Sequence, residues 1–150
     1  MAWQQAVRPF GLFVVAAALT LSLAGCRDEP EALKDGSYQA RSAGDEDGSY
    51  GEVTLKVAGG KITECTYTSH LKDGSLKGAD YGKVHGEIRD TRRYEKAQAG
   101  IAHLNDYARA LVMLQRVSQI DAISGATLAY DQFSDCVWQI YEKADAGAGK

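Results

Sequence analysis

The chain has 150 residues, a length typical of a single domain. Hydrophobic residues make up 45% of it and charged residues 25%, which is ordinary for a globular protein and argues against general disorder. The formal net charge at pH 7 is −3, so the chain lacks the basic surplus expected of a nucleic-acid-binding protein.

The first 25 residues have the pattern of a secretory signal peptide. One Arg precedes an apolar run over residues 10–24, which is too short for a comfortable membrane span. The run ends in Leu23-Ala24-Gly25-Cys26, which resembles the lipobox of bacterial lipoproteins, where cleavage precedes the Cys and the Cys is lipidated. We therefore expect lipidation of Cys26, a lipidated tether over 26–34, and a bacterial membrane location facing the periplasm or the cell exterior. A structural thiol is the alternative role for Cys26.

Three stretches predict the strands of a small antiparallel sheet. Residues 38–42 alternate after an Asp-Gly turn signal, which predicts an edge strand. Residues 53–57 alternate aliphatic and polar side chains, which predicts a half-buried strand. Gly59-Gly60 then predicts a tight hairpin turn into a strand over 62–68. The acidic segment 44–48 lacks the ligand spacing of an EF-hand and is expected to be a hairpin turn.

The second half of the chain has a helical period. Residues 91–117 predict one amphipathic helix or two short ones, with Gly100 as a candidate break because glycine costs a helix about 1 kcal/mol relative to alanine. Residues 120–123 are compatible with a short strand. A helix is predicted over 128–144, followed by a flexible tail over 145–150. The expected fold class is α+β, a small antiparallel sheet packed against two or more helices on one side.

Two cysteines, Cys65 and Cys136, lie in the expected domain. In an oxidising compartment they could pair, and otherwise they would act as small hydrophobic side chains of the core. The sequence gives no distance between them, so both alternatives stay open. The three histidines lack the spacing of a metal site, and no metal site is predicted.

The segment before the last predicted helix reads Asp121-Ala122-Ile123-Ser124-Gly125-Ala126-Thr127. Gly125 permits a backbone conformation that a side chain would hinder, and its neighbours are small. Thr127 falls in the first helical turn, where free backbone N–H groups and the helix dipole favour a phosphate. The alternative is that Ser124 or Thr127 only caps the helix.

The order of these features resembles the FMN-binding domain family. The resemblance rests on Asp35-Gly36-Ser37-Tyr38, on Gly60-Lys61-Ile62 and above all on the Asp-x-x-Ser-Gly-Ala-Thr motif of residues 121–127. In that family the last Thr of the motif carries FMN through a phosphoester bond that a separate FMN transferase of the ApbE type makes. The resemblance implies a domain over 35–144, with Thr127 as the attachment residue and Asp121, Ser124, Gly125 and Ala126 as the recognition motif around it.

The long Gly-rich loop over 69–90 contains a segment that also resembles small extracellular members of the family. Lys77 is therefore expected near polar ring or phosphate oxygens of FMN, and Tyr81 against the flavin ring. The alternative is a solvated loop in which Tyr81 packs on the sheet.

The family resemblance implies a redox carrier, and together with the lipobox it predicts a lipid-anchored flavin carrier that passes electrons between membrane donors and extracytoplasmic acceptors. No catalytic triad signature accompanies the motif, so an enzyme with its own substrate is not favoured. Two alternatives remain: a flavin-dependent reductase of a small oxidant, and a binding lipoprotein without flavin.

Overall fold

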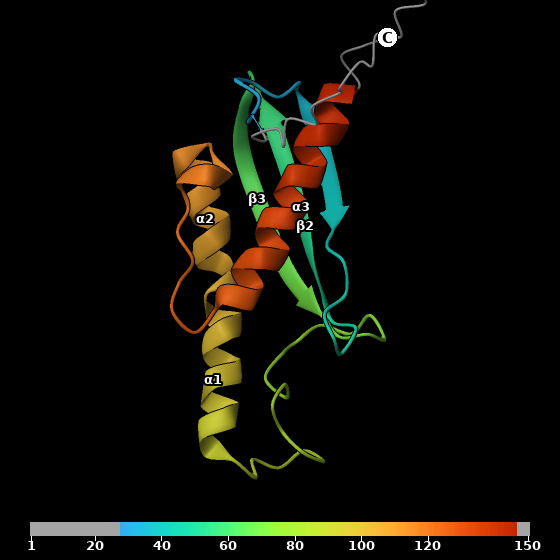
Figure 1. The fold of residues 1–150 in the computed structure, drawn as a ribbon, viewed down its shortest axis with the longest axis vertical. Coiled ribbons are helices and arrows are strands. Elements are labelled where there is room, and N and C mark those ends of the chain that lie inside the picture. The colour runs from blue at the N-terminus through green and yellow to red at the C-terminus, as the bar shows by residue number, and fades with distance from the viewer. Residues whose placement is uncertain (1–27, 147–150) are drawn as a thin grey trace, which may run out of the picture.

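The computed structural model describes residues 28–146, in which three antiparallel strands carry helices on one face (Figure 1). The elements in chain order are β1 (Gly36–Arg41), β2 (Tyr50–Ala58), β3 (Lys61–His70), α1 (Thr91–Ala102), α2 (Leu104–Leu114), the short 3₁₀ helix η1 (Val117–Gln119) and α3 (Thr127–Ala146). The expected α+β fold is confirmed. The predicted signal peptide, Cys26 and residues 147–150 lie outside the described residues.

The sheet has the order β1-β2-β3, and its hairpins follow the expected turns. Gly59 and Gly60 have φ values of 60° and 74°, as a two-residue type I′ turn requires. The register between β2 and β3 shifts near the turn, because Lys56 pairs with Glu64 whereas Val57 pairs with Ile62. The extra residue lies on β3 and forms a β-bulge, next to which the Ile62 side chain is buried in the core.

The core lies between one face of the sheet and helices α2 and α3. Val53 and Leu55 of β2 are fully buried, and Leu111 of α2 and Phe133 of α3 meet them in one hydrophobic cluster. Glu52, Thr54, Lys56 and Ala58 alternate with these residues along β2 and are half-buried or exposed. Helix α2 packs on β3, while α3 lies across β2 and β1.

The predicted helical stretch over 91–117 consists of two helices, which is one of its two expected forms. The break falls at His103, three residues after Gly100. Asp90 caps the N-terminus of α1, because its side chain accepts a hydrogen bond from the Arg93 N–H at 3.0 Å. None of the residues of α1 is buried, so this helix extends beyond the core.

The prediction of a short strand over 120–123 is wrong, because the structure has no strand there. The Ile120 N–H bonds to the Val117 carbonyl at 3.1 Å, and the Ile123 N–H bonds to the Tyr107 hydroxyl at 2.8 Å. These groups are therefore satisfied without a neighbouring strand. Within residues 28–146, none of the helices has the length and hydropathy of a membrane span.

Cys65 and Cys136 are free thiols. Burial raises the pKa of each to about 12, so both remain protonated at neutral pH. The Cys136 thiol lies 3.4 Å from the Gly51 carbonyl oxygen inside the core. The structure therefore supports the alternative in which the two cysteines act as small hydrophobic side chains of the core.

Gln115 joins the end of α2 to the edge strand β3. Its backbone is left-handed, with φ of 64°, and its side-chain amide bonds to both the N–H and the carbonyl of Ile62, at 2.8 and 2.9 Å. Gln115→Asn keeps an amide and tolerates the left-handed backbone, but its side chain is one methylene too short to reach Ile62.

We expect Gln115→Asn to lower the free energy of unfolding by about 1–3 kcal/mol, because the Ile62 backbone groups lose their partners. Urea denaturation followed by circular dichroism measures this loss. The same substitution at the exposed Gln119 is the control and should stay within about 0.5 kcal/mol of the parent. Equal losses at both positions would contradict the bridging role of Gln115.

Candidate functional site

A tight turn over residues 123–126 positions the start of α3. The Ala126 N–H donates to the Ile123 carbonyl at 2.9 Å, and Gly125 has a φ of 87°, as the third residue of a type II turn does. The Tyr130 N–H then donates to the Ala126 carbonyl at 3.0 Å, which is the first hydrogen bond of α3. Gly125 is needed here for its backbone conformation, and Thr127 becomes the first residue of the helix.

The buried Tyr107 hydroxyl of α2 binds both ends of this turn. It accepts a hydrogen bond from the Ile123 N–H at 2.8 Å and donates to the Ala126 carbonyl at 3.2 Å. The Tyr107 side chain is only 1% exposed, and burial raises the pKa of its hydroxyl. A second hydroxyl, from Tyr67 of β3, donates to the Ala129 carbonyl at 2.7 Å. The start of α3 is therefore fixed to α2 and to the sheet.

The Thr127 side chain lies exposed at this fixed position. Among the described residues, neither the Thr127 hydroxyl nor the Ser124 hydroxyl has a hydrogen-bond partner. The residue that precedes the helix is Ala126, whose methyl group cannot cap it. The capping alternative is therefore not what the structure shows. The first N–H groups of α3 remain available for an anion.

Thr127 opens into a pocket of about 570 Å³, a volume within the usual range for small-molecule and cofactor sites. Four parts of the chain contribute to it: the end of β3, the loop 71–90, one face of α1 with the start of α2, and the first turns of α3. Its lining residues are Ser69, Lys77, Tyr81, Arg93, Lys96, Ala97, Gly100, Ile101, Leu104, Gly125, Ala126, Thr127, Leu128, Ala129 and Gln132.

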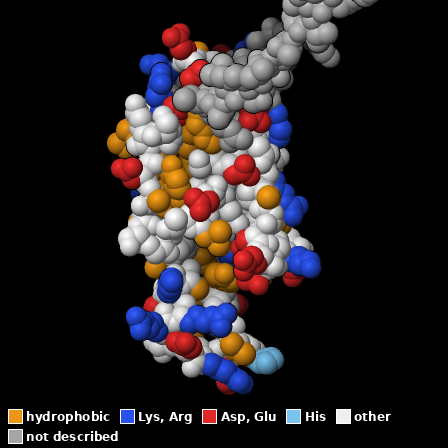
Figure 2. Space-filling model, in the orientation of Figure 1, with side chains coloured by type: hydrophobic (Ala, Val, Ile, Leu, Met, Phe, Trp, Pro, Cys, Tyr) orange, Lys and Arg blue, Asp and Glu red, His pale blue; other side chains and the backbone are white. Residues whose placement is uncertain are grey.

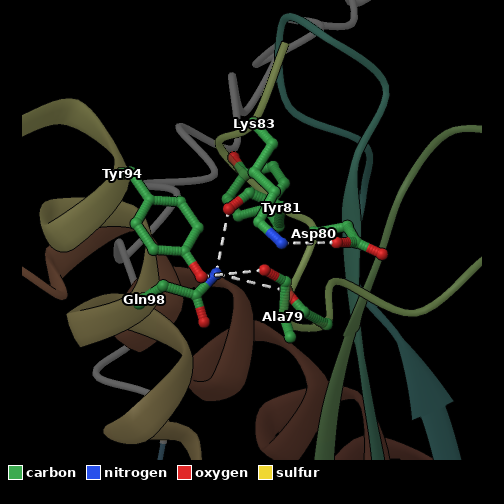
Figure 3. A network of polar contacts seen from close by, with 7 residues as sticks. Ala79, Asp80, Tyr81, Lys83, Tyr94 and Gln98 are labelled. Carbon is green, nitrogen blue, oxygen red and sulfur yellow. Dashed lines mark hydrogen bonds and ion pairs between the residues drawn. The ribbon is translucent and has the colours of Figure 1, made fainter. Parts of the chain in front are cut away.

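Hydrogen bonds to α1 hold the loop beside this pocket (Figure 3). The Gln98 amide donates to the carbonyls of Gly78 and Tyr81, at 3.2 and 2.9 Å. The Tyr94 hydroxyl donates to the Ala79 carbonyl at 2.9 Å. These contacts fix the backbone of the loop to α1, and the Tyr81 side chain lines the pocket.

The pocket is basic. Lys77, Arg93 and Lys96 line it without any Asp or Glu, and none of the three forms an ion pair with a described residue. The Lys77 ammonium lies 4.7 Å from the centre of the Tyr81 ring, within the range of a cation–π contact. Figure 2 shows Lys and Arg side chains at the lower end of the molecule, where Figure 1 places α1 and the loop 71–90.

The structure brings most of the predicted site residues together. Lys77, Tyr81, Gly125, Ala126 and Thr127 share the pocket wall. The two remaining residues of the motif do not reach it, because Asp121 and Ser124 lie exposed outside the pocket.

Sequence reasoning missed the contribution of α1. Ile101 and Leu104 pack on the hydrophobic core and also line the pocket, together with Arg93 and Lys96. Small residues at Ala97 and Gly100, one turn apart on the same face, are the signal that could have indicated an open wall.

A family model for the FMN-binding domain matches residues 47–142. The chain belongs to this family. The crystal structure of the CPE2226 protein from Clostridium perfringens is 27% identical, with a TM-score of 0.61, over 79% of this chain and 93% of that one. A solution NMR structure of a Clostridium thermocellum protein is also 27% identical, with a TM-score of 0.39, over 79% of this chain and 94% of that one. Among curated proteins, none matches the chain significantly.

The family match makes FMN the cofactor against which the pocket must be tested. Three cations that form no ion pair with a described residue and the start of α3 suit a phosphate, while Tyr81, Ile101 and Leu128 offer apolar surface for a flavin ring. The residues present therefore fit FMN, and they support a flavin-binding, electron-transfer role for the domain.

We expect Tyr107→Phe to loosen the turn over 123–126 while keeping the ring contacts that Tyr107 makes with Tyr130 and Phe133. The Ile123 N–H loses its acceptor, so its hydrogen exchange should accelerate more than that of the β2 amides. Loss of these buried hydrogen bonds should also cost about 1–3 kcal/mol of stability.

Hydrogen exchange of Ile123, read by NMR, measures the local effect. Tyr141→Phe is the control, because the Tyr141 hydroxyl contacts the backbone of Val117, and Tyr141 is also a buried residue but lies in the second half of α3, away from the turn. Unchanged exchange at Ile123 in Tyr107→Phe would show that the hydroxyl does not hold the turn.

Proposed function

We propose that Thr127 carries FMN through a phosphoester bond and that the protein is a lipid-anchored extracytoplasmic electron carrier. The observation that carries this proposal is the Thr127 hydroxyl, which is exposed, has no partner among the described residues and lies in the wall of a basic pocket. A phosphate joined to this oxygen would lie beside the free N–H groups at the start of α3.

Attachment requires one bond to form and one to break. The Thr127 oxygen forms the new P–O bond and loses its proton, and the activating group on the phosphate of the flavin donor departs. An FMN transferase of the ApbE type would supply this donor and the base. The net gain of the chain is FMN less one water. Thr127 takes part in this step once and has no role in later electron transfer.

The motif residues that lie outside the pocket have a role in this proposal. Asp121 and Ser124 are exposed six and three residues before Thr127, so a transferase can contact them while the attachment oxygen is being modified. Gly125 and Ala126 act differently, because they shape the turn that presents Thr127.

The phosphoester retains one negative charge, which Arg93 and Lys96 can neutralise from the α1 side of the pocket. The dipole of α3 adds only about 0.3–1 kcal/mol. This is too little to keep a dissociable cofactor in a dilute exterior, so retention depends on the covalent bond.

FMN, when bound, supplies the reversible uptake of electrons. The chain supplies orientation and charge: Tyr81, Ile101 and Leu128 give apolar contact to a ring, and Lys77 places a positive charge beside Tyr81. No carboxylate or imidazole is among the described residues that line the pocket. The described lining thus lacks the His, Asp and Glu side chains that enzymes most often use for proton transfer, which supports a carrier.

The anchor completes the proposal. Cys26 follows a signal-peptide pattern and precedes the described domain by two residues. Its acyl chains, at about 0.8 kcal/mol for each buried CH₂, would hold the domain at a bacterial membrane facing the periplasm or the cell exterior. Redox donor and acceptor proteins would meet it there.

We expect Thr127→Ala to abolish covalent FMN after co-expression with an active transferase, because no other hydroxyl occupies the attachment position. Thr127→Ser should still be modified. Thr91→Ala is the matched control, since Thr91 is the first residue of α1 and lies outside the pocket. Intact mass spectrometry measures the added flavin, and full modification of Thr127→Ala would refute the attachment site.

We also expect Lys77→Gln to lower the midpoint potential of the attached flavin by roughly 20–30 mV, because reduction adds negative charge that Lys77 stabilises by ~1 kcal/mol. Lys72→Gln removes an exposed lysine of the same loop that does not line the pocket, and it should leave the potential unchanged. Spectroelectrochemical titration compares the two variants. Equal shifts would mean that Lys77 is not near the ring.

A further inference from the structure

The residues expected to form a loose tether are packed against the domain. The Glu29 carboxylate accepts hydrogen bonds from the Ser118 N–H at 3.0 Å and from the Ser118 hydroxyl at 2.6 Å. An Arg116 guanidinium nitrogen lies 4.0 Å from the same carboxylate. The Glu29 side chain is only 5% exposed. We call this set of contacts between Glu29, Arg116 and Ser118 the N-terminal contact.

The chain stays fixed between the N-terminal contact and the sheet. Leu33 is buried in the hydrophobic core, and the Tyr38 hydroxyl of β1 donates to the Lys34 carbonyl at 2.8 Å. The packed part of the chain therefore begins at Glu29 and not at residue 35. Only three peptide steps separate Glu29 from Cys26, which limits their Cα–Cα distance to about 11 Å.

The N-terminal contact and the flavin pocket lie at opposite ends of α2. Leu104, the first residue of α2, lines the pocket, whereas η1 with Ser118 follows the last turn of the helix. A helix of 11 residues is about 16 Å long, so the pocket is displaced from the contact by at least that order of distance. In Figure 1 the upper end holds the first described residues and the end of α2, and the lower end holds α1 and the loop 71–90.

Two apolar side chains are exposed beside the N-terminal contact. Met113 is 81% exposed and Leu114 is 42% exposed, and both lie in the last turn of α2 just before Arg116. Leu76, Val84, Ile88 and Leu128 are exposed at the pocket end, so exposed apolar side chains alone do not select an orientation, and the short distance from Glu29 to the anchor has to do so.

We propose that the N-terminal contact fixes the orientation of the domain on the membrane, with the end that carries Met113 and Leu114 facing the bilayer. This proposal rests on lipidation of Cys26. Because the anchor enters the bilayer within about 11 Å of Glu29, the end of the domain that binds Glu29 is the end held at the surface. This surface of the domain therefore contacts the lipid bilayer itself.

The orientation selects the kind of redox partner. The flavin pocket opens at the end away from the bilayer, so it meets electron donors and acceptors from the aqueous side. A protein or a water-soluble compound can reach it there, whereas a quinone confined to the lipid interior cannot contact the ring directly.

Tryptophan fluorescence tests the orientation on the full-length lipidated chain without flavin. The parent carries Trp138→Phe, which leaves the mature chain without tryptophan. One probe is Met113→Trp, and the other is Ala99→Trp on the exposed side of α1. Both are reconstituted in phosphatidylcholine vesicles that contain a lipid with a nitroxide quencher at its headgroup. We expect quenching to be several-fold greater for Met113→Trp than for Ala99→Trp.

The second part of the experiment removes the N-terminal contact by substitution of Glu29. Glu29→Ala should bring the two probes towards equal quenching, because the domain can then tilt on its anchor. Glu31→Ala is the matched control, since Glu31 is an exposed acid of the same segment, and it should leave the difference intact. Circular dichroism establishes that each variant is folded.

The outcomes separate this inference from the proposed function. Lipidated protein with equal quenching of both probes, or with stronger quenching of Ala99→Trp, would overturn the orientation and leave the anchor standing. Protein whose mass shows an unmodified Cys26 would overturn the anchor and this inference together. Covalent flavin attachment is unaffected by either result, because the experiment uses the protein before flavin is added.

Discussion

The arrangement of the site depends on one buried hydroxyl. Tyr107 packs in the core through its ring and holds the turn over 123–126 through its oxygen, so the interior of the domain and the start of α3 form one unit. Thr127 thereby has a fixed place although its own side chain is exposed. The proposed attachment of FMN requires that Thr127 be accessible before modification. Its position has to be set by its neighbours, and Tyr107 is the neighbour that sets it.

The pocket is assembled where the core ends. Helix α1 contributes no buried residue and instead lines the pocket with its small and basic side chains, while Gln98 and Tyr94 hold the loop against it. The residues that stabilise the fold are therefore largely different from the residues that line the cofactor pocket. The sheet, α2 and α3 form a core that does not need the flavin, and the cations that suit a phosphate lie outside that core.

Local signals predicted much of the fold and part of the site. The alternation in β2, the paired glycines at 59–60 and the small residues before Thr127 each carry their own structural reason, and they led to the sheet, the hairpin and the turn. Contacts between distant segments were not predictable in this way. Arg93 and Lys96 line the pocket because α1 extends past the core. Glu29 is held by Ser118, which lies 89 residues further along the chain, and no local pattern predicts such a contact. The prediction of a strand over 120–123 was wrong, and the Ile123 N–H donates to the Tyr107 hydroxyl instead of to a neighbouring strand.

Esterification of the flavin phosphate to Thr127 would change how that phosphate ionises, and the phosphorus NMR signal of the flavin-loaded domain measures this ionisation. A phosphate monoester has a second pKa near 6, whereas a phosphodiester has no ionisation in that range. If FMN is joined to Thr127, the phosphorus chemical shift of the loaded protein should stay constant between about pH 5 and pH 8. A signal that titrates near pH 6, and that leaves with free FMN when the protein is denatured, would contradict covalent attachment.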